Sequence, residues 1–336
     1  NIITTSFPLR KFHNLIKSKL IGLVGLNFGT SINIIDTSVG RGGDIKKYLI
    51  NSDIDCSYLF GLDIYPIEEA CKRFYENKNK KTKGIFIQYD TSKSIENENG
   101  YVGTKDEIKH SKILMNILYN KKLNIPEKYK QVRSNYNSIA LNGFDIVSCQ
   151  FSLHYYFKNE KTLRTYLNNL KYICKKGGIF IGTCYDGNDI LKLFGEENEI
   201  GYIKDNELVY KLEKIKVSDF KYNKENISNM FNNSISVFMD SIGDKYIEYL
   251  VNFDFFIDIM KEYGFELYEP PKTSKKYNQF INKSIDSFES ILLNLSKITD
   301  DYELNKFYKK SLDILKDKNL YNLSKTNKYF IFKKVN

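Results

Sequence analysis

The sequence predicts an α/β protein whose sheet is mostly parallel and doubly wound, with helices on both faces. Three observations support this fold class. Short apolar runs rich in β-branched residues alternate with stretches of helical periodicity. These runs are apolar throughout, as strands that are covered on both faces require. A glycine-rich loop directly follows the first run, at the strand-to-helix turn where such sheets bind nucleotides.

The expected elements follow one another in a regular order. An amphipathic helix over 8–21 comes first, because apolar residues recur there at helical spacing. The expected strands of the sheet are 32–36, 58–64, 85–89, 144–149 and 178–183. The expected helices between and after them are 42–49, 67–75, 162–174 and 189–194. Such an alternation of strand and helix is typical of a parallel sheet.

Two segments interrupt this alternation. Residues 93–142 are polar, and we expect an insertion with one or two helices, the best candidate covering 108–119. Residues 201–252 contain mixed strand-like runs and form a second expected insertion. Beyond it we expect helices over 253–263, 275–295 and 301–317 and a terminal strand over 329–332. No repeat or linker is visible, so we expect residues 1–336 to form a single domain with insertions.

Charge and cysteine usage limit the classes of function. The net charge of +10 permits a phosphate-bearing partner, although a lysine-rich composition explains the charge equally well. Only three His occur and no two of the five Cys form a C-x-x-C pair, so we expect no metal site. Four of the five Cys stand in apolar stretches, which favours an intracellular, reducing compartment, cytoplasmic or virion-associated if the protein is viral.

The ends of the chain and its hydropathy carry two further expectations. No apolar run is long enough for a transmembrane helix, which needs about 18 residues or more. The chain starts with Asn1 rather than Met, and we expect it to be excised from a larger polypeptide.

The glycine-rich loop is the strongest local feature. Residues 36–44 read Asp-Thr-Ser-Val-Gly-Arg-Gly-Gly-Asp. Gly40, Gly42 and Gly43 let the backbone turn tightly and approach a ligand closely. A glycine loop alone is weak evidence, and a tight strand-to-helix turn without a ligand is the alternative interpretation. Its place after the first strand favours nucleotide binding.

Three acidic residues stand at the ends of successive expected strands. Asp63 follows Asp36 by 27 residues, and Asp90 follows Asp63 by the same interval. A carboxylate in the place of Asp63 can accept both hydroxyls of an adenosine ribose, and one in the place of Asp90 can accept from the adenine amino group. Each Asp alone is more often the N-cap of a helix or a residue that ends a strand. The loop is G-x-G-G-D rather than G-x-G-x-x-G, which favours a methyl donor over a nicotinamide cofactor.

Several motifs stand in one order along the chain and together resemble a known family. They are G-R-G-G-D over 40–44, C-Q-F-x-x-H-Y over 149–155 and G-G-x-F-I-G-T over 177–183. L-R-K-F-H-N-L-I-K-S over 9–18 and I-E-Y-L-V over 247–251 add to them. This set resembles the cap guanine-N7 methyltransferase family of eukaryotes and large DNA viruses. The resemblance covers nearly the whole chain, except the 93–142 insertion and much of 201–240.

The resemblance implies a fold and an activity. The fold would be that of a Rossmann-like class I S-adenosylmethionine-dependent methyltransferase. The reaction would move a methyl group from S-adenosylmethionine to N7 of the terminal guanine of a 5′ RNA cap by in-line displacement. Capped RNA would be the substrate. Triphosphatase and guanylyltransferase domains of the same polypeptide, or an activating subunit, would be partners.

The resemblance also implies the roles of individual residues, without a general acid, a general base or a metal. Those that would bind the methyl donor are Lys17, Ser38, Gly40, Asp63, Asp90, Gln150 and Tyr155. Those that would bind the cap are His13, Asn14, Arg41, Lys47, Arg73, Phe151, His154, Glu248 and Tyr329. Gln150, Tyr155 and Glu248 would position the reacting groups. The terminal strand could also align two residues earlier, with Asn327 in place of Tyr329.

The sequence departs from the family pattern in three places, and other interpretations stay open. Ser38 stands where the family has Gly, and His13 where it has Asn. The helix after Asp63 is about two residues shorter than in the family, so Lys72 is an alternative to Arg73. His154 alone would be read as a core histidine, and Glu248 alone as a surface acid. The chain could instead methylate another RNA, DNA or a small molecule. It could also be a non-catalytic RNA-binding or partner-activating module, which the Ser38 departure motivates.

Overall fold

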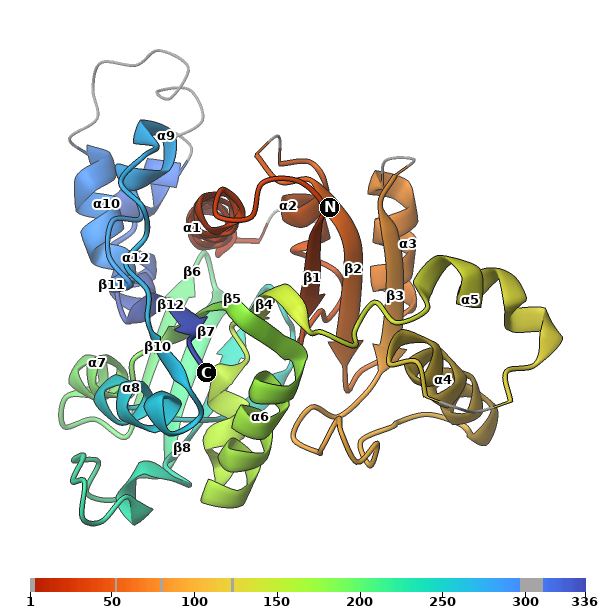
Figure 1. Ribbon diagram of the computed structural model, residues 1–336. Helices are drawn as coiled ribbons and strands as arrows, with labels where there is room; N and C mark the ends of the chain where they lie inside the picture. Colours follow the sequence, from red (N-terminus) through yellow and green to blue (C-terminus); the bar gives the residue numbers. More distant parts are fainter. Residues whose placement is uncertain (1–3, 52, 79–80, 122–123, 297–310) are drawn as a thin grey trace.

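Two β-sheets form the framework of the computed structural model, which describes residues 4–51, 53–78, 81–121, 124–296 and 311–336 (Figure 1). The larger sheet has the order β10-β12-β5-β4-β1-β2-β3, with β11 pairing along β12. The first five of its strands are β1 (Ile32–Asp36), β2 (Cys56–Asp63), β3 (Lys83–Gln88), β4 (Phe144–Gln150) and β5 (Cys174–Tyr185). The others are β10 (Phe265–Leu267), β11 (Ile285–Ser287) and β12 (Asn327–Lys334).

The pairing pattern confirms the predicted α/β fold with a mostly parallel sheet. β1 pairs in parallel with β2 and β4, β2 with β3, and β4 with β5. β12 runs antiparallel to β5, β10 and β11. The chain order reverses between β1 and β4, and ligands of doubly wound sheets bind outside the carboxyl ends of the strands at such a reversal. The site is therefore expected where β1 and β4 end.

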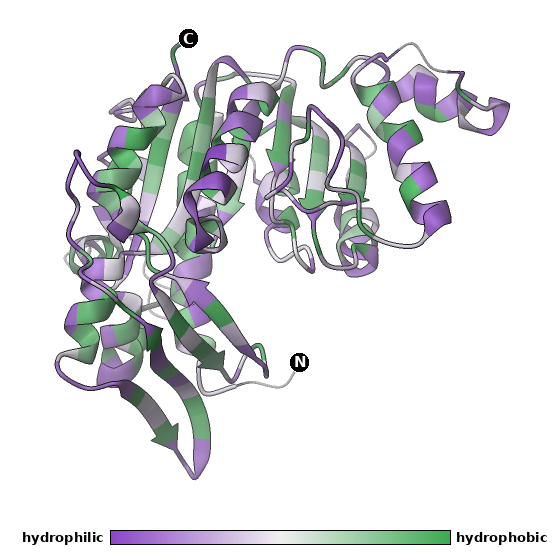
Figure 2. Cartoon of the chain, turned by 90° about the horizontal axis from the view of Figure 1, so that it is seen from below, coloured by the Kyte–Doolittle hydropathy of each residue, from purple (hydrophilic) through white to green (hydrophobic). Residues whose placement is uncertain are grey.

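Helices cover both faces of this sheet. They include α1 (Phe7–Gly25), α2 (Ile45–Leu49), α3 (Glu68–Asn77), α6 (Glu160–Ile173), α7 (Gly187–Phe194) and α8 (Phe253–Glu262). α1 and α6 both contact β4 and β5, from opposite sides of the sheet (Figure 1). β4 is buried along its whole length, as the continuous apolar pattern predicts. Figure 2 shows hydrophobic residues concentrated along the central strands.

Two segments, within the stretches expected to be insertions, add elements outside the large sheet. The first contains α4 (Lys105–Leu118) and α5 (Lys130–Tyr136) and lies at the β3 edge of the sheet (Figure 1). Thr104 and Glu107 start α4 with a reciprocal capping box. The second forms an antiparallel sheet in the order β6 (Glu199–Lys204), β7 (Glu207–Lys216), β8 (Ser234–Met239) and β9 (Lys245–Tyr249). β9 contacts the 3₁₀ helix η2 (Leu153–Lys158), which follows β4.

The predicted long helix over 275–295 is wrong. The segment contains the short helix α9 (Lys275–Asn278), then β11, then α10 (Phe288–Ser296). β11 pairs with β12, and this long-range pairing requires an extended backbone that the local helical pattern could not reveal.

The predicted helix over 301–317 lies partly outside the described residues, which resume at 311. Its described part is the 3₁₀ helix η4 (Leu312–Lys316), and a separate helix α12 (Lys318–Ser324) follows. Asp317 caps α12, because its carboxylate accepts from the backbone N–H groups of Asn319 and Leu320. α10 and α12 lie beside α1 (Figure 1).

Two sequence-based expectations concern the chain as a whole. No described helix combines the length and the apolar character that crossing a bilayer demands. The five Cys are free thiols, and Cys71 alone among them is partly exposed. The other four are core residues, as their apolar neighbours in the sequence predicted.

Candidate functional site

The glycine loop is tied to the end of β2. The Gly40 N–H donates to Asp63 Oδ2 at 2.7 Å, and the Tyr65 N–H donates to Asp63 Oδ1 at 2.9 Å. Burial raises the pKa of Asp63. Each carboxylate oxygen keeps a further lone-pair direction for a ligand hydroxyl. The carboxylate is thus fixed at the carboxyl edge of the sheet, next to the loop.

The loop turns in a way that requires glycine at one position and leaves space at another. Gly42 has φ +77°, and a Cβ there would lie 2.7 Å from Ile45 Cδ1 and 3.0 Å from Ala70 Cα. Gly40 has φ +51°, and a Cβ there would have no atom within 4 Å. The backbone at Gly40 therefore faces open space. The nearby Ser38 Oγ is buried and has no hydrogen-bond partner among the described residues.

Asp90 lies at the same edge, just beyond β3. Gln88 is the partner of Asp63 in the parallel register, and the Tyr89 N–H donates to the Asp63 carbonyl at 2.6 Å. Asp90 Oδ1 accepts from the Ser92 N–H at 2.9 Å, and its side chain is partly exposed. Asp63 and Asp90 thus stand on neighbouring strand ends, as the 27-residue spacing predicted.

A buried hydrogen-bond chain joins the end of β1 to the ends of β4 and β5. The Tyr48 hydroxyl lies 2.9 Å from Asp36 Oδ2 and 2.8 Å from Ser148 Oγ. Gln150 Nε2 donates to Ser148 Oγ at 3.0 Å, and Thr183 Oγ1 donates to Gln150 Oε1 at 2.9 Å. Burial, followed by the negative charge of Asp44, raises the pKa of Asp36 to about 7. Both ends of the Gln150 amide are therefore held by hydroxyl groups.

Two lysines meet one carboxylate between α1 and the glycine loop. Lys17 Nζ lies 2.6 Å and Lys47 Nζ 2.7 Å from Asp44 Oδ1, and all three side chains are largely buried. Burial alone would raise the pKa of Asp44, but the two ammonium groups lower it to about 2. Burial and the charge of Lys17 lower the pKa of Lys47, although Asp44 opposes them. The group carries a net positive charge, which favours an anionic ligand.

Aromatic rings form a wall between α1 and the end of β4. Phe151 has φ +52°, a left-handed conformation that is strained for a bulky side chain. Its ring stacks on His13 at 5.2 Å with an interplanar angle of 18°, and Lys17 Nζ lies 5.5 Å above it. Phe288 of α10 contacts both rings edge-on. Burial, followed by the charge of Lys17, lowers the pKa of His13 to about 3, so the imidazole is neutral.

The second sheet brings Glu248 to the same region. His154 Nε2 lies 3.5 Å from Glu248 Oε1, and the two side chains are 4% and 14% exposed. Burial lowers the pKa of His154 to about 3 and raises that of Glu248 to about 8. The contact therefore joins two neutral groups at neutral pH. The His154 ring stacks on Tyr185 at 5.3 Å and contacts Tyr155, which is 42% exposed.

The remaining predicted residues lie at different distances from this group. Arg41 of the glycine loop and Asn14 of α1 are exposed. Arg73 is not brought to the group: among the described residues it pairs with Glu69 on its own helix, at 3.0 Å. Tyr329 is fully buried opposite Thr183, and its hydroxyl donates to the Lys283 carbonyl at 3.1 Å.

Asn327 was the alternative to Tyr329 on the terminal strand. It lies opposite Tyr185, and its amide donates to the carbonyls of Leu323 and Ser324. Both side chains are thus engaged with the backbone of the C-terminal segment.

Sequence reasoning missed several residues that hold the site together. Asp44 collects the two lysines, and it was visible as the last residue of the glycine motif. Tyr48 and Tyr185 orient Asp36 and His154, but both look like ordinary core aromatics in the sequence. Ser324 of α12 lies 2.9 Å from His13 Nε2. No local pattern could have linked residues so far apart in the chain.

Comparison with known proteins gives one family and a set of relatives. Residues 3–311 match the family described as "mRNA (guanine-N(7))-methyltransferase domain". The mRNA cap guanine-N(7) methyltransferase of Meyerozyma guilliermondii is 28% identical over 313 aligned positions, which cover 88% of this chain and 49% of that protein. A probable mRNA-capping enzyme of Acanthamoeba polyphaga mimivirus is 25% identical over 349 positions, with 97% and 27% covered. The chain therefore spans about half or less of these relatives.

A solved structure of an S-adenosylmethionine-dependent methyltransferase from Clostridium acetobutylicum also matches. The TM-score is 0.44 at 15% identity, over 76% of this chain and 80% of that chain.

Proposed function

The chain belongs to the mRNA (guanine-N(7))-methyltransferase domain family, and from this premise we propose that it methylates N7 of the terminal guanine of a 5′ RNA cap with S-adenosylmethionine as donor. The observation that supports this function most strongly is the contact between His154 and Glu248, at 3.5 Å. Glu248 comes from the second sheet, yet it lies beside the motif that follows β4. A carboxylate there suits the N1–H and N2–H donors of guanine.

The carboxyl edge of β1 to β4 fits the methyl donor. The open backbone at Gly40 and the unpartnered Ser38 hydroxyl leave room and a polar group for the methionine part. In the proposed arrangement Lys17 holds the donor carboxylate, Asp63 the ribose hydroxyls and Asp90 the adenine amino group. Lys17 would then exchange part of its contact with Asp44 for the ligand.

The aromatic wall and the second sheet fit the cap. Phe151 and His154 wall the guanine, Glu248 binds its edge, and His13 and Asn14 contact the cap nucleoside. His154 Nε2 is buried without a hydrogen-bond partner among the described residues, so it suits a polar ligand atom. His13 and His154 are neutral, so Glu248, once ionised, is the charged group beside the guanine. Its negative charge suits the positive charge that methylation gives the base.

The cap phosphates are assigned to basic residues of the first half of the chain. Arg41 is exposed on the glycine loop, and Lys47 projects from α2. Arg73 is the third candidate, and it would have to leave Glu69 to take part. Tyr329 is the last cap candidate, and its ring would have to become accessible to take part, because the side chain is fully buried and its hydroxyl donates to a backbone carbonyl.

Catalysis in this proposal comes from positioning. When bound, the donor supplies a methyl group on a cationic sulfonium. Guanine N7 carries a lone pair and no proton, so no residue has to act as general acid or base. The Gln150 amide, held between Ser148 and Thr183, and the Tyr155 ring would lie beside the bound donor and orient its methyl group toward the base. Alignment of this kind accelerates bimolecular reactions strongly.

We also propose a wider setting for the chain. Residues 1–336 form one methyltransferase domain with two insertions, within a larger capping polypeptide in an intracellular, reducing compartment. Triphosphatase and guanylyltransferase domains, or an activating subunit, are its partners. The match to a probable mRNA-capping enzyme, of which the chain covers 27%, supports this setting.

Methyl transfer from radiolabelled donor to GpppA-capped RNA tests the function, with uncapped RNA and GTP alongside. We expect cap-dependent label in 7-methylguanosine. Glu248→Ala should lower kcat/KM for the cap by about a hundredfold, because a buried hydrogen-bonding anchor is lost. Glu207→Ala, an exposed acid of the same sheet, should leave it unchanged.

Other outcomes would redirect the assignment. Label in uncapped RNA, or full activity of Glu248→Ala, would overturn the cap reading. Donor binding without any transfer would favour a binding module.

A further inference from the structure

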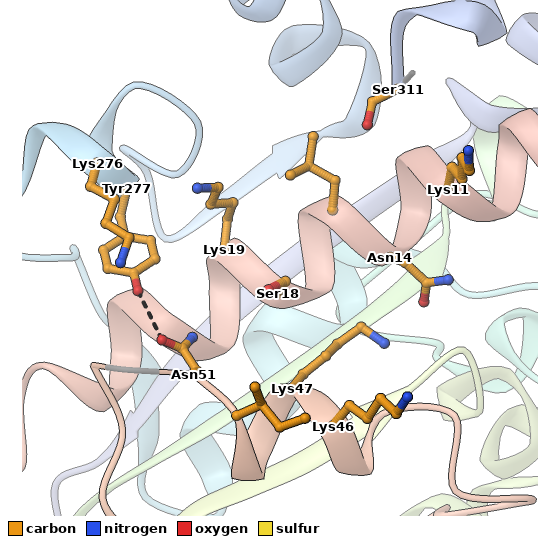
Figure 3. Close-up of a pocket in the computed structure, with 12 residues that line it drawn as sticks. Lys11, Asn14, Ser18, Lys19, Lys46, Lys47, Asn51, Lys276, Tyr277 and Ser311 are labelled. Atoms are coloured by element: carbon orange, nitrogen blue, oxygen red, sulfur yellow. Dashed lines mark hydrogen bonds between the residues drawn. The ribbon is translucent and has the colours of Figure 1, made fainter. Parts of the chain in front are cut away.

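A basic cavity adjoins the candidate site and shares two residues with it. It has a volume of about 650 Å³ and lies between α1, α2 and α9 (Figure 3). The residues that line it are Lys11, Asn14, Leu15, Ser18, Lys19, Lys46, Lys47, Ile50, Asn51, Lys276, Tyr277 and Ser311. Asn14 and Lys47 also belong to the candidate cap residues. Neither Asp63 nor Glu248 lines it, so the cavity continues the site outward from the phosphate end.

Helix α1 serves the two regions with two different faces. His13 and Lys17, one turn apart, point to Phe151 and Asp44. Lys11, Ser18 and Lys19 lie on another face and line the cavity, as Figure 3 shows for their side chains. From Lys11 to Lys19 the helix rises by about 12 Å. Lys11 and Lys19 therefore form a cationic stripe along the cavity rather than a single charged point.

The described residues that line the cavity carry a surplus of positive charge. None of the described residues that line it is acidic. Lys276 pairs with Asp53, and Lys47 shares Asp44 with Lys17. Burial, followed by the charge of Lys276, lowers the pKa of Lys19 to about 8. Lysines crowded together in this way attract anions, and they carry no geometric preference for one anion.

We propose that this cavity holds the backbone phosphates of the RNA nucleotides that follow the cap. The proposal rests on the proposed function, because Lys47 would join the cap phosphates to the first phosphates of the chain. A stripe of about 12 Å is longer than a single phosphate group, so it can contact more than one phosphate of an RNA backbone. Point-charge lysines contact phosphates without reading sequence, so an RNA of any sequence would fit.

The lining favours an RNA chain over a single small anion. The lysines are spread along a helix and come from α1, α2 and α9, whereas a compact anion would need convergent donors. Ile50 adds apolar surface between the charges, against which a sugar can pack. Ile50 is 61% exposed. The cavity thus combines separated charges with apolar contact area.

The test compares a capped oligonucleotide of about ten nucleotides with the GpppA dinucleotide, in the double variant Lys11→Ala/Lys46→Ala. Neither residue belongs to the proposed donor or cap sets. We expect KM for the capped oligonucleotide to rise about tenfold, with kcat and the GpppA kinetics unchanged. Binding of the uncapped oligonucleotide, measured by fluorescence anisotropy, should weaken equally. The slope of log K against log salt should become shallower by about 1.4, for two lost phosphate contacts.

The matched control is Lys161→Ala/Lys171→Ala, which removes two exposed charges from α6. Equal weakening in this control would overturn the proposal, because general electrostatic attraction would then suffice. Unchanged oligonucleotide binding in Lys11→Ala/Lys46→Ala would also overturn it. So would binding that does not depend on RNA length, combined with an equal loss of affinity for inorganic triphosphate in the variant, measured by competition. Binding of uncapped RNA is measured without methyl transfer. Failure of the cap assignment would appear as absent GpppA methylation in the wild type, so it can be distinguished from failure of the RNA-binding proposal.

Discussion

Burial gives single residues of the site their properties. Glu248 and His154 are both neutral near neutral pH because the protein withdraws them from water, so their 3.5 Å contact is not an ion pair. Asp44 shows the opposite case, since two ammonium groups keep it ionised despite burial. Asp36 lies between these extremes, with its pKa raised to about 7. Burial together with the charge of the neighbours, rather than the residue type alone, therefore decides the charge of each group.

Cap affinity should depend on pH through Glu248. The pKa of Glu248 is raised to about 8 by burial, so the free protein holds a proton there below that pH. Guanine N1–H and N2–H are both donors and need the ionised carboxylate, so binding releases the proton and strengthens as pH rises. We expect the Kd for GpppA to fall roughly tenfold between about pH 6.5 and about pH 8.5, measured by calorimetry.

Glu248→Gln is the matched variant for this prediction. It keeps the shape of the side chain and cannot ionise, so its GpppA affinity should be weaker and flat over the same pH range. The same pH slope in this variant would show that another group titrates.

The turn between β1 and α2 defines the edge of the large sheet to which we assign the methyl donor. Its shape depends on glycine at one position, because Gly42 combines φ +77° with close contact to Ile45 and α3. α1 is the second defining element. One of its faces completes the site and another lines the basic cavity. The C-terminal helices α10 and α12 hold α1 in place through Phe288 and Ser324.

Gly42→Ala should destabilise this turn. The new Cβ would lie 2.7 Å from Ile45 Cδ1 in a left-handed backbone conformation. We expect the free energy of unfolding to fall by about 2–3 kcal/mol, measured by urea denaturation. Gly43→Ala is the control, because its Cβ would meet no atom within 4 Å and its φ is not left-handed. It should change the free energy by less than about 0.5 kcal/mol. Equal effects would mean that the turn is not limited by sterics.

At the scale of the whole molecule, two sheets of different construction contribute residues to the candidate site. The parallel sheet supplies the donor edge, and the antiparallel sheet supplies Glu248 through contacts between β9 and η2. The insertion with α4 and α5 lies at the β3 edge (Figure 1). The net charge of +10 fits a phosphate-bearing substrate, and the basic cavity gives part of that charge a location.

The two sheets should unfold together if the chain is one domain. S-adenosylhomocysteine at about a hundredfold excess over its Kd should raise the free energy of unfolding by about 2.7 kcal/mol. The chain has no Trp, so circular dichroism and Tyr fluorescence are the probes, and their transitions should coincide and shift together. Two transitions with only one shifted would contradict the single-domain proposal.

Asp63→Asn should abolish the shift that S-adenosylhomocysteine causes, because the carboxylate proposed to hold the ribose is lost.

The sequence alone determined the features that depend on neighbours along the chain. The strands from β1 to β5 and the helices between them follow from hydrophobic periodicity and were predicted within a few residues. The glycine turn and the acids at the strand ends follow from the same local order. Parallel strands end at one edge, so the meeting of Asp63 and Asp90 was also predictable.

Only the tertiary structure decided which distant residues meet. It pairs β11 with β12 where the sequence predicted a helix, joins Lys17 to Asp44, and sets Glu248 beside His154. It also gathers lysines of α1, α2 and α9 around one cavity. The physical reason is that such contacts depend on side-chain packing and burial between segments that are far apart in the chain, and local periodicity carries no information about them.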